Sequence, residues 1–169
     1  MADDSIDPIR YRRVLGHFPT GVTVVTGLAE DGGPVGLTIG SFTSVSLDPP
    51  LVGFLPMVNS DRWPGMRPAG VFCVNVLASD QGELCWRFAK TGLEDQFAGV
   101  DWRPSSATGS PILEGAIAWI DCSIEGVVDA GDHHFVIGRV LQLEHVAAES
   151  EPNALLFFRG KLGEFIQHE

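Results

Sequence analysis

The chain has 169 residues, a formal net charge of −11 and 44% hydrophobic residues. This length and composition are typical of one globular domain with its own hydrophobic core. The excess of acidic residues argues against nucleic acid or an anionic membrane as a partner, because phosphate binding depends on clustered Lys and Arg. No run approaches the roughly 18 apolar residues of a membrane span, and the acidic first residues lack a signal-peptide layout. We therefore expect a soluble cytoplasmic protein with no membrane or nucleic-acid partner.

The cysteines and histidines give no sign of a metal site or a disulfide. Three cysteines lie far apart with no CxxC pair, so we expect reduced core residues. His133 and His134 are adjacent and would point to opposite faces of a strand, and neither has a second ligand at metal-binding spacing.

The first predicted element is a short helix. Asp7-Pro8 pairs an N-cap residue with proline at the first helical position, which predicts a helix over residues 9–18 that Pro19 ends. Residues 1–7 are expected to form a flexible tail.

Three strands are predicted next. Residues 20–28 are rich in β-branched side chains and read as a strand, and residues 29–34 as its turn. A return strand is expected over 35–46. Asp48-Pro49-Pro50 would break any hydrogen-bonded ladder, and residues 51–57 would resume as a strand.

The return strand carries unusually many hydroxyl groups for a predicted core strand. Five fall within nine residues, at Thr38, Ser41, Thr43, Ser44 and Ser46. A buried hydroxyl without a partner costs roughly 1–3 kcal/mol. Either the backbone satisfies these hydroxyls, or a polar ligand does.

The rest of the chain is predicted to be mostly β. Residues 59–70 hold at most a turn or two of helix, 71–77 form a buried strand, and Ser79 caps a helix that reaches about Lys90. Residues 98–114 are expected to be loop. The last strands are predicted over 116–125, 134–147, 154–158 and 162–166.

About seven short strands with two or three helices favour an antiparallel barrel over a doubly wound parallel sheet. The sequence also lacks G-x-G-x-x-G after a first strand, a P-loop and a G-x-S-x-G nucleophile elbow. A Rossmann site, a P-loop site and a serine hydrolase are therefore unsupported.

Six blocks, in this order, resemble the flavin reductase domain family, which serves two-component flavin monooxygenases. They are FPTGVTVVT at 18–26, SFTSVSLDPPLV at 41–52, FCVNVLA at 72–78, RFA at 87–89, GDHHFVIGRV at 131–140 and LLFFRG at 155–160. The resemblance implies an FMN-binding split β-barrel, antiparallel and Greek-key-like, with a few short helices and one domain over 1–169. It also implies a homodimer that binds FMN or FAD at the subunit interface, reduces it with NADH or NADPH and supplies a separate monooxygenase.

The resemblance also implies a set of site residues. The flavin ring would be lined by Thr38, Ser41, Phe42, Thr43, Ser44 and Val45. Asn59 and Ser60 would approach the ribityl phosphate, with Arg87 or Arg62 supplying charge. His133 would position the nicotinamide, while His134 is expected to be an ordinary strand residue. The entrance to the flavin would be shaped by Phe18, Pro19, Thr20 and Gly21.

One position departs from the family pattern, and two other functions stay open. The family often carries a tyrosine shortly after the segment that is Arg159-Gly160 here, whereas this chain has Leu162. A C-terminal hydroxyl or aromatic contact is therefore in doubt. A related split-barrel protein could instead keep flavin as a prosthetic group for its own oxidation reaction, or bind flavin or haem without turnover.

Overall fold

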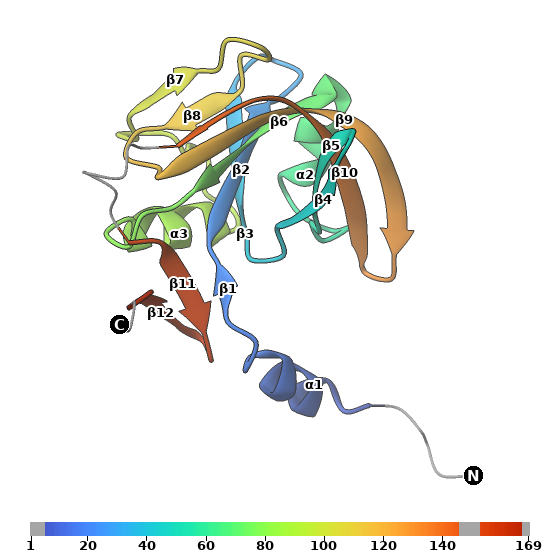
Figure 1. Cartoon of the computed structure of the whole chain (residues 1–169), viewed down its shortest axis with the longest axis vertical. Helices are drawn as coiled ribbons and strands as arrows, with labels where there is room; N and C mark the ends of the chain where they lie inside the picture. The colour runs from blue at the N-terminus through green and yellow to red at the C-terminus, as the bar shows by residue number, and fades with distance from the viewer. Residues whose placement is uncertain (1–5, 146–152, 167–169) are drawn as a thin grey trace.

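Antiparallel β-sheets make up most of the computed structural model, which describes residues 6–145 and 153–166 (Figure 1). The helices are α1 (Pro8–Leu15), α2 (Trp63–Met66) and α3 (Gly82–Ala89), with a 3-10 turn, η1 (Arg67–Ala69). The strands are β1 (Thr20–Gly21), β2 (Thr23–Leu28), β3 (Pro34–Ile39), β4 (Thr43–Leu47), β5 (Pro50–Phe54), β6 (Val71–Val76), β7 (Trp102–Pro104), β8 (Pro111–Leu113), β9 (Ala118–Ala130), β10 (His133–His145), β11 (Leu155–Phe158) and β12 (Lys161–Glu164).

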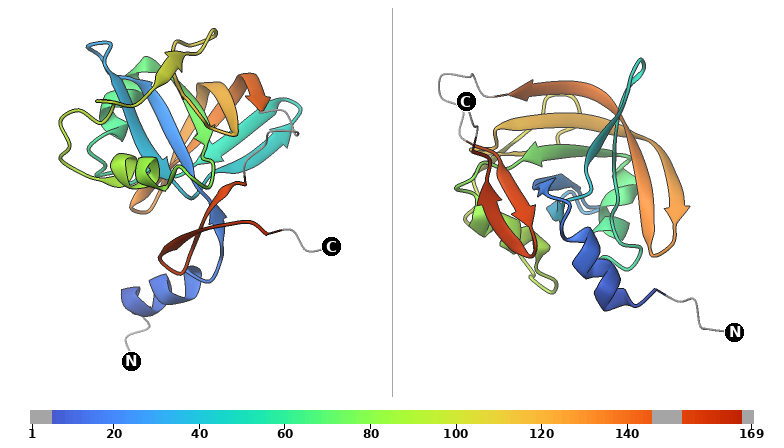
Figure 2. Two further views of the ribbon diagram at one scale, coloured as in Figure 1. Left: turned by 90° about the vertical axis from the view of Figure 1, so that its left-hand side faces the viewer. Right: turned by 60° about the horizontal axis from the view of Figure 1, so that its bottom comes forward.

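Seven strands form one curved sheet in the order β3-β2-β6-β9-β10-β5-β4. Its two edge strands, β3 and β4, are not paired with each other, so the sheet curls into a barrel that remains split (Figure 2). The mostly-β, antiparallel split-barrel prediction is confirmed. The long β9–β10 hairpin turns at Gly131-Asp132, which places His133 at the first position of β10.

Aromatic packing fills the barrel. Phe54 meets Trp63 edge-on at 5.7 Å between ring centroids, and meets Phe72 at 5.1 Å. A second apolar cluster includes Phe88 of α3 and Leu113 of β8. Burying a side chain of this size contributes about 1.5–3 kcal/mol, so these two clusters are the main favourable term in folding.

α1 begins where Asp7-Pro8 predicted. The Asp7 carboxylate accepts hydrogen bonds from the backbone N–H of Ile9 (3.2 Å) and Arg10 (3.1 Å), which would otherwise lack partners. The helix ends at Leu15, earlier than predicted, and buries none of its residues. The left view of Figure 2 shows it standing away from the barrel. Residues 1–5 of the predicted tail lie outside the described residues.

The prediction of one buried, hydroxyl-rich strand over 35–46 was wrong. The strand divides at Gly40–Phe42 into β3 and β4, and β4 is an edge strand on which Thr43, Ser44 and Val45 are exposed. Solvent reaches these hydroxyls directly, whereas β3, at the opposite edge of the sheet, buries most of its residues.

Other boundaries also differ from the predictions. Ser79 does not cap α3; the helix begins at Gly82, and the Gln81 side chain instead accepts a hydrogen bond from the N–H of Ala78 (3.0 Å). Residues 98–114 contain the β7–β8 hairpin. The strand predicted over 20–28 is interrupted at Val22, and the strand predicted over 116–125 continues to Ala130. Pro50 opens β5, because the first residue of a strand can do without a ladder donor.

Residues 146–147, the predicted end of the strand that starts at His133, lie outside the described residues. Among the residues that the structure describes, no helix has the length and apolar character needed to cross a membrane.

Candidate functional site

A cleft of about 580 Å³ opens where four segments converge. They are the end of β3, the segment from β5 to α2, the residues that follow α3, and the start of β10. Small-molecule sites usually measure roughly 300–1,000 Å³ and carry a few polar groups on mainly apolar walls. The cleft therefore has the size and the lining of a site for a small organic ligand.

Five of the residues predicted for the site line this cleft together. They come from separate parts of the chain and are Thr38, Ser41, Asn59, Ser60 and His133, and Arg62, one of the two candidates for the phosphate charge, lines it with them. The fold brings them together because β3 and β5 end, and β10 begins, at the same mouth of the barrel (Figure 1).

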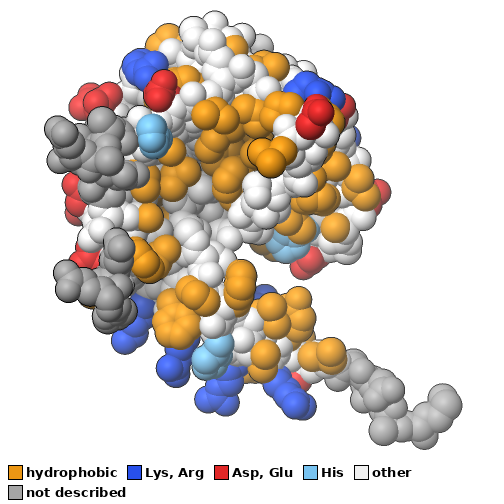
Figure 3. Space-filling model, viewed as in Figure 1, with side chains coloured by type: hydrophobic (Ala, Val, Ile, Leu, Met, Phe, Trp, Pro, Cys, Tyr) orange, Lys and Arg blue, Asp and Glu red, His pale blue; other side chains and the backbone are white. Residues whose placement is uncertain are grey.

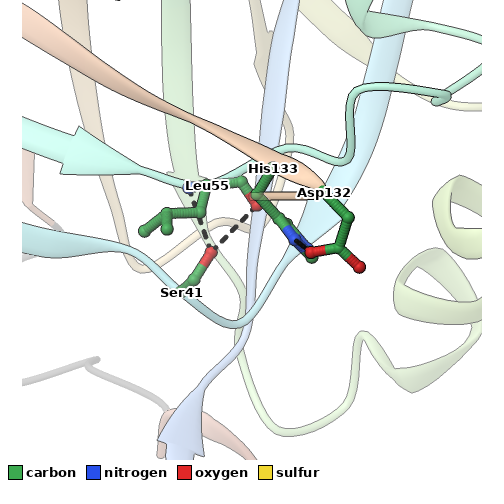
Figure 4. A network of polar contacts seen from close by, with 4 residues as sticks. All are labelled: Ser41, Leu55, Asp132 and His133. Carbon is green, nitrogen blue, oxygen red and sulfur yellow. Dashed lines mark hydrogen bonds and ion pairs between the residues drawn. The ribbon is translucent and has the colours of Figure 1, made fainter. Parts of the chain in front are cut away.

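Backbone groups satisfy the first two hydroxyls. The Thr38 hydroxyl donates to the carbonyl of Cys85 (2.7 Å). The Ser41 hydroxyl donates to the carbonyl of Leu55 (3.3 Å) and accepts from the N–H of the same residue (3.1 Å), which fastens the turn before β4 to the end of β5 (Figure 4). Each oxygen keeps a lone pair for a further donor.

Ser60 presents the opposite capacity. Its oxygen accepts hydrogen bonds from the backbone N–H of Arg62 (3.2 Å) and of Trp63 (3.3 Å). Both contacts use lone pairs, and the hydroxyl proton has no acceptor among residues 6–145 and 153–166. The Ser60 hydroxyl is thus free to donate to an anion in the cleft.

Two cationic side chains line the same cleft. Arg62 donates from Nη2 to the carbonyl of Leu93, while its Nε is buried and has no partner within the described part of the chain. Lys90 follows the last residue of α3 and forms no ion pair with any described residue. One acidic residue, Asp61, also lines the cleft. A guanidinium, an ammonium and a free hydroxyl proton together suit a phosphate or carboxylate.

Arg87, the other cation considered for this role, lies elsewhere. Its Nη1 donates to the carbonyls of Gln96 (3.1 Å) and Ala98 (2.8 Å), and it does not line the cleft. Its guanidinium ties α3 to the chain that follows.

His133 is oriented by its neighbour. Its Nδ1 lies 2.7 Å from a carboxylate oxygen of Asp132, and since a carboxylate only accepts, Nδ1 is the donor (Figure 4). This hydrogen bond, together with the charge of the ring when protonated, lowers the pKa of Asp132. The His133 side chain is 35% exposed, and its backbone pairs with Met57 across the cleft wall.

The remaining predicted residues lie outside the cleft. Phe42 packs against the barrel core, and Thr43, Ser44 and Val45 continue along the exposed edge strand β4. The four residues predicted for the entrance lie on the connection from α1 through β1. Phe18 is 72% exposed there, and Thr20 borders a smaller apolar pocket that shares Thr38 with the cleft. The other two residues predicted for the entrance are Pro19 and Gly21.

The sequence did not single out several residues of the cleft. Lys90 lines the cleft, although the sequence marked it only as the approximate end of the helix that contains Arg87. The apolar wall from Leu55 to Met57 had been assigned to a strand interior. The signal that could have found it is Pro56, since proline cannot donate to a ladder and often marks a strand end.

Comparison with known proteins identifies relatives over nearly the whole chain. A family model described as "Flavin reductase like domain" matches residues 15–165. A flavin reductase from Pseudomonas putida is 53% identical over 161 residues, which cover 95% of this chain and 92% of the relative. The reductase subunit of a flavin-dependent monooxygenase from Rhodococcus jostii is 48% identical over 161 residues, covering 95% of this chain and 80% of the relative.

Solved structures show the same fold. Nitrilotriacetate monooxygenase component B from Mycobacterium thermoresistibile matches with a TM-score of 0.88 and 46% identity, over 94% of this chain and 86% of that chain. An NADH:FAD oxidoreductase from Streptomyces globisporus, in complex with NAD and FAD fragments, matches with a TM-score of 0.84 and 35% identity, over 96% and 97% of the two chains.

Proposed function

From the premise that this chain belongs to the flavin reductase-like domain family, we propose that the cleft holds the flavin phosphate and that His133 orients the nicotinamide beside it. The protein is an NAD(P)H:flavin oxidoreductase, with FMN or FAD as the flavin and NADH or NADPH as the reductant. A separate oxygenase component is its partner. We take residues 1–169 to act as one domain in this reaction.

The observation that supports the phosphate assignment is the unused hydrogen-bonding capacity of two residues that line the cleft. The Ser60 hydroxyl proton and the buried Nε of Arg62 both lack partners within the described residues, and Lys90 lines the same cleft. A phosphate ester offers several acceptor oxygens and a negative charge, and hydrogen bonds to a charged group contribute about 1.5–3 kcal/mol each. The residues present therefore fit the ribityl phosphate.

The edge strand β4 suits the other end of the flavin. The isoalloxazine ring carries carbonyls and nitrogens along one side, and Thr43, Ser44 and Val45 offer hydroxyl and backbone groups beside Ser41 on an edge that pairs only with β5 among the described strands. When bound, the flavin accepts a hydride from the nicotinamide. Hydride transfer depends on stacking and distance, so the protein acts mainly by holding the two rings in position.

His133 performs the positioning step at the nicotinamide. Asp132 fixes the imidazole by its 2.7 Å hydrogen bond to Nδ1, and Nε2 remains available at the cleft wall. A ring held in one orientation restricts how the nicotinamide can approach.

We also propose that a second copy of the chain completes the site. α1 buries no residue, so its large apolar side chains Ile9, Val14 and Leu15 are exposed to solvent in the single chain. Leu47 on β4 is 95% exposed as well. Figure 3 shows hydrophobic side chains gathered along the α1 region, with Lys and Arg on its outer side. Light scattering is expected to give about twice the chain mass of 18.2 kDa. A monomer at all concentrations would contradict this proposal.

We place the reaction in the cytoplasm, on the evidence of the thiols. Cys73, Cys85 and Cys122 are all free and buried, which suits a reducing compartment.

Flavin titration of a double variant tests the site. Ser44→Ala with Asn59→Ala is expected to weaken flavin binding, measured by flavin fluorescence, and to leave the circular dichroism spectrum unchanged, because both side chains are exposed. The matched control is Ser106→Ala with Asn153→Ala, which changes two other exposed polar residues away from the cleft. Unchanged affinity in the folded test variant would remove these residues from the site.

A further inference from the structure

One hydrogen bond next to the cleft-lining segment 59–62 joins two residues that the proposed reaction does not use. The indole Nε1 of Trp63 donates to Nδ1 of His134 at 2.9 Å. An indole N–H can only donate, so Nδ1 of His134 is the acceptor and carries no proton in this contact. Trp63 is 1% exposed, and the His134 side chain is 14% exposed. The other ring nitrogen, Nε2, lies 3.5 Å from a carboxylate oxygen of Asp129.

Trp63 is the first residue of α2 and directly follows the segment 59–62, all of which lines the cleft. Its backbone N–H donates to the Ser60 hydroxyl, and its ring packs edge-on against Phe54 in the core. Trp63 is therefore held at both ends, by Ser60 at its backbone and by His134 at its side chain.

The other contacts between this part of the chain and β10 occur earlier in the sequence. The N–H of His134 donates to the carbonyl of Pro56 (3.0 Å), and the N–H of Val58 donates to the carbonyl of Asp132 (3.0 Å). Beyond Val58, the hydrogen bond from Trp63 to His134 is the next one that ties this part of the chain to the β9–β10 hairpin among the described residues. Residues 59–62 thus span the interval between two anchors, and His134 supplies the second.

We infer that His134 is a positioning residue for the flavin phosphate, acting through Trp63 to hold Ser60 and Arg62 in their places in the cleft. This inference rests on the proposed assignment of the cleft to that phosphate. With the His134 imidazole as the second anchor, the segment 59–62 that carries Ser60 and Arg62 is already ordered. Phosphate binding then does not have to offset the conformational entropy of ordering that segment. The same contact has no bearing on the flavin ring, which we place along β4.

The test compares FMN with riboflavin, which lacks the phosphate, in three variants. His134→Leu removes the acceptor, Trp63→Phe removes the donor but keeps an aromatic ring against Phe54, and His134→Asn keeps an acceptor oxygen near the position of Nδ1. We expect the dissociation constant for FMN to rise about fivefold to tenfold in the first two, the loss of about one hydrogen bond. Affinity for riboflavin is expected to change less than twofold. His134→Asn is expected to restore most of the FMN affinity.

A double-mutant comparison separates this role from general destabilisation. Because both substitutions remove the same contact, His134→Leu with Trp63→Phe is expected to weaken FMN binding no more than either alone. Asp129→Asn, which leaves the contact with Trp63 intact, is the matched control and is expected to bind FMN like the unmodified protein. Equal losses for FMN and riboflavin, or no rescue by His134→Asn, would overturn the inference.

The unmodified protein provides a measurement that does not depend on a variant folding. By linkage, if the contact favours phosphate binding, the phosphate must favour the contact. FMN is therefore expected to slow hydrogen exchange of the Trp63 indole proton more than riboflavin does, and equal exchange with both would also overturn the inference. Failure of the underlying phosphate assignment has a different signature, since the unmodified protein would then bind FMN no more tightly than riboflavin.

Discussion

Replacing His133 with alanine is expected to slow reduction of bound flavin while leaving flavin affinity nearly unchanged. The imidazole stands on the cleft wall, held by Asp132 at 2.7 Å, and no other described side chain contacts its nitrogens within hydrogen-bonding distance. Removing it takes away one oriented ring that restricts the approach of the nicotinamide. It leaves the Ser60 and Arg62 groups that we assign to the flavin phosphate in place.

The magnitude follows from the kind of contact that is lost. One positioning interaction contributes about 1–3 kcal/mol to the transition state, which corresponds to a rate lower by about 5-fold to 150-fold. Stability should change little because the side chain is partly exposed and does not pack in the core. For a chain of this length, we expect the thermal midpoint to shift by less than about 4 °C.

Stopped-flow reduction of flavin bound before mixing separates the two effects, because flavin binding is complete when the nicotinamide arrives. The control is His145→Ala, which removes an exposed histidine from the far end of β10. Reduction rates equal to those of the unmodified protein at every NAD(P)H concentration would refute the assignment of His133.

The titration of Asp132 gives a second readout of the same contact. In the unmodified protein the hydrogen bond from His133 lowers the Asp132 pKa. The contribution of the Asp132 carboxylate to the free energy of unfolding is therefore present above its unfolded-state pKa, and it is lost as the pH falls through the lower folded-state pKa. In His133→Ala the Asp132 pKa, followed by NMR, is expected to return upward toward its ordinary value. An unchanged value would show that the contact does not form in solution.

Two further predictions concern packing and the thiols. Gly138→Ala would place a Cβ 2.3 Å from the ring of Phe72, so overpacking is expected to lower the free energy of unfolding by about 1–3 kcal/mol. The control is Gly126→Ala, whose Cβ would meet nothing within 4 Å. If the control lowered the free energy of unfolding as much as Gly138→Ala, the packing explanation would be contradicted. Burial raises the pKa of the Cys73 thiol and raises that of Cys122 to about 12, with the charge of a nearby carboxylate adding to both shifts. A thiol reagent at mildly alkaline pH is therefore expected to label neither cysteine until the protein is unfolded, and rapid labelling of the native protein would contradict their burial.

Local chemical rules predicted some elements and failed where tertiary structure decides. Asp7-Pro8 was read correctly because an N-cap is made by residues adjacent in the sequence. Ser79 offers the same local signal, but its backbone N–H is bonded to the carbonyl of Asn153 and the helix starts later, at Gly82. This contact with a distant part of the chain helps to place Ser79, and local pattern reasoning cannot see it.

For the candidate site, too, sequence patterns predicted some features and missed those that depend on tertiary structure. The hydroxyl-rich stretch was recognised, but its division at Gly40 into a mostly buried strand and an exposed strand, at opposite edges of the sheet, depends on which strands lie beside each half. His134 was expected to be an ordinary strand residue, and only the fold reveals its hydrogen bond to Trp63, which lies 71 residues away in the sequence. The family resemblance left Arg87 and Arg62 as alternatives for the phosphate charge; the carbonyls that bind the Arg87 guanidinium distinguish them.

The most direct test of the account is steady-state oxidation of NADH and NADPH by the purified protein with FMN or FAD added in excess. The account predicts many turnovers per chain, at a rate that depends on the added flavin, with one nicotinamide and one flavin preferred. It also predicts that adding the paired oxygenase would consume the reduced flavin without a covalent link between the two proteins. No oxidation with any of the four combinations, or flavin that stays with the protein through gel filtration and does not exchange with free flavin, would contradict it.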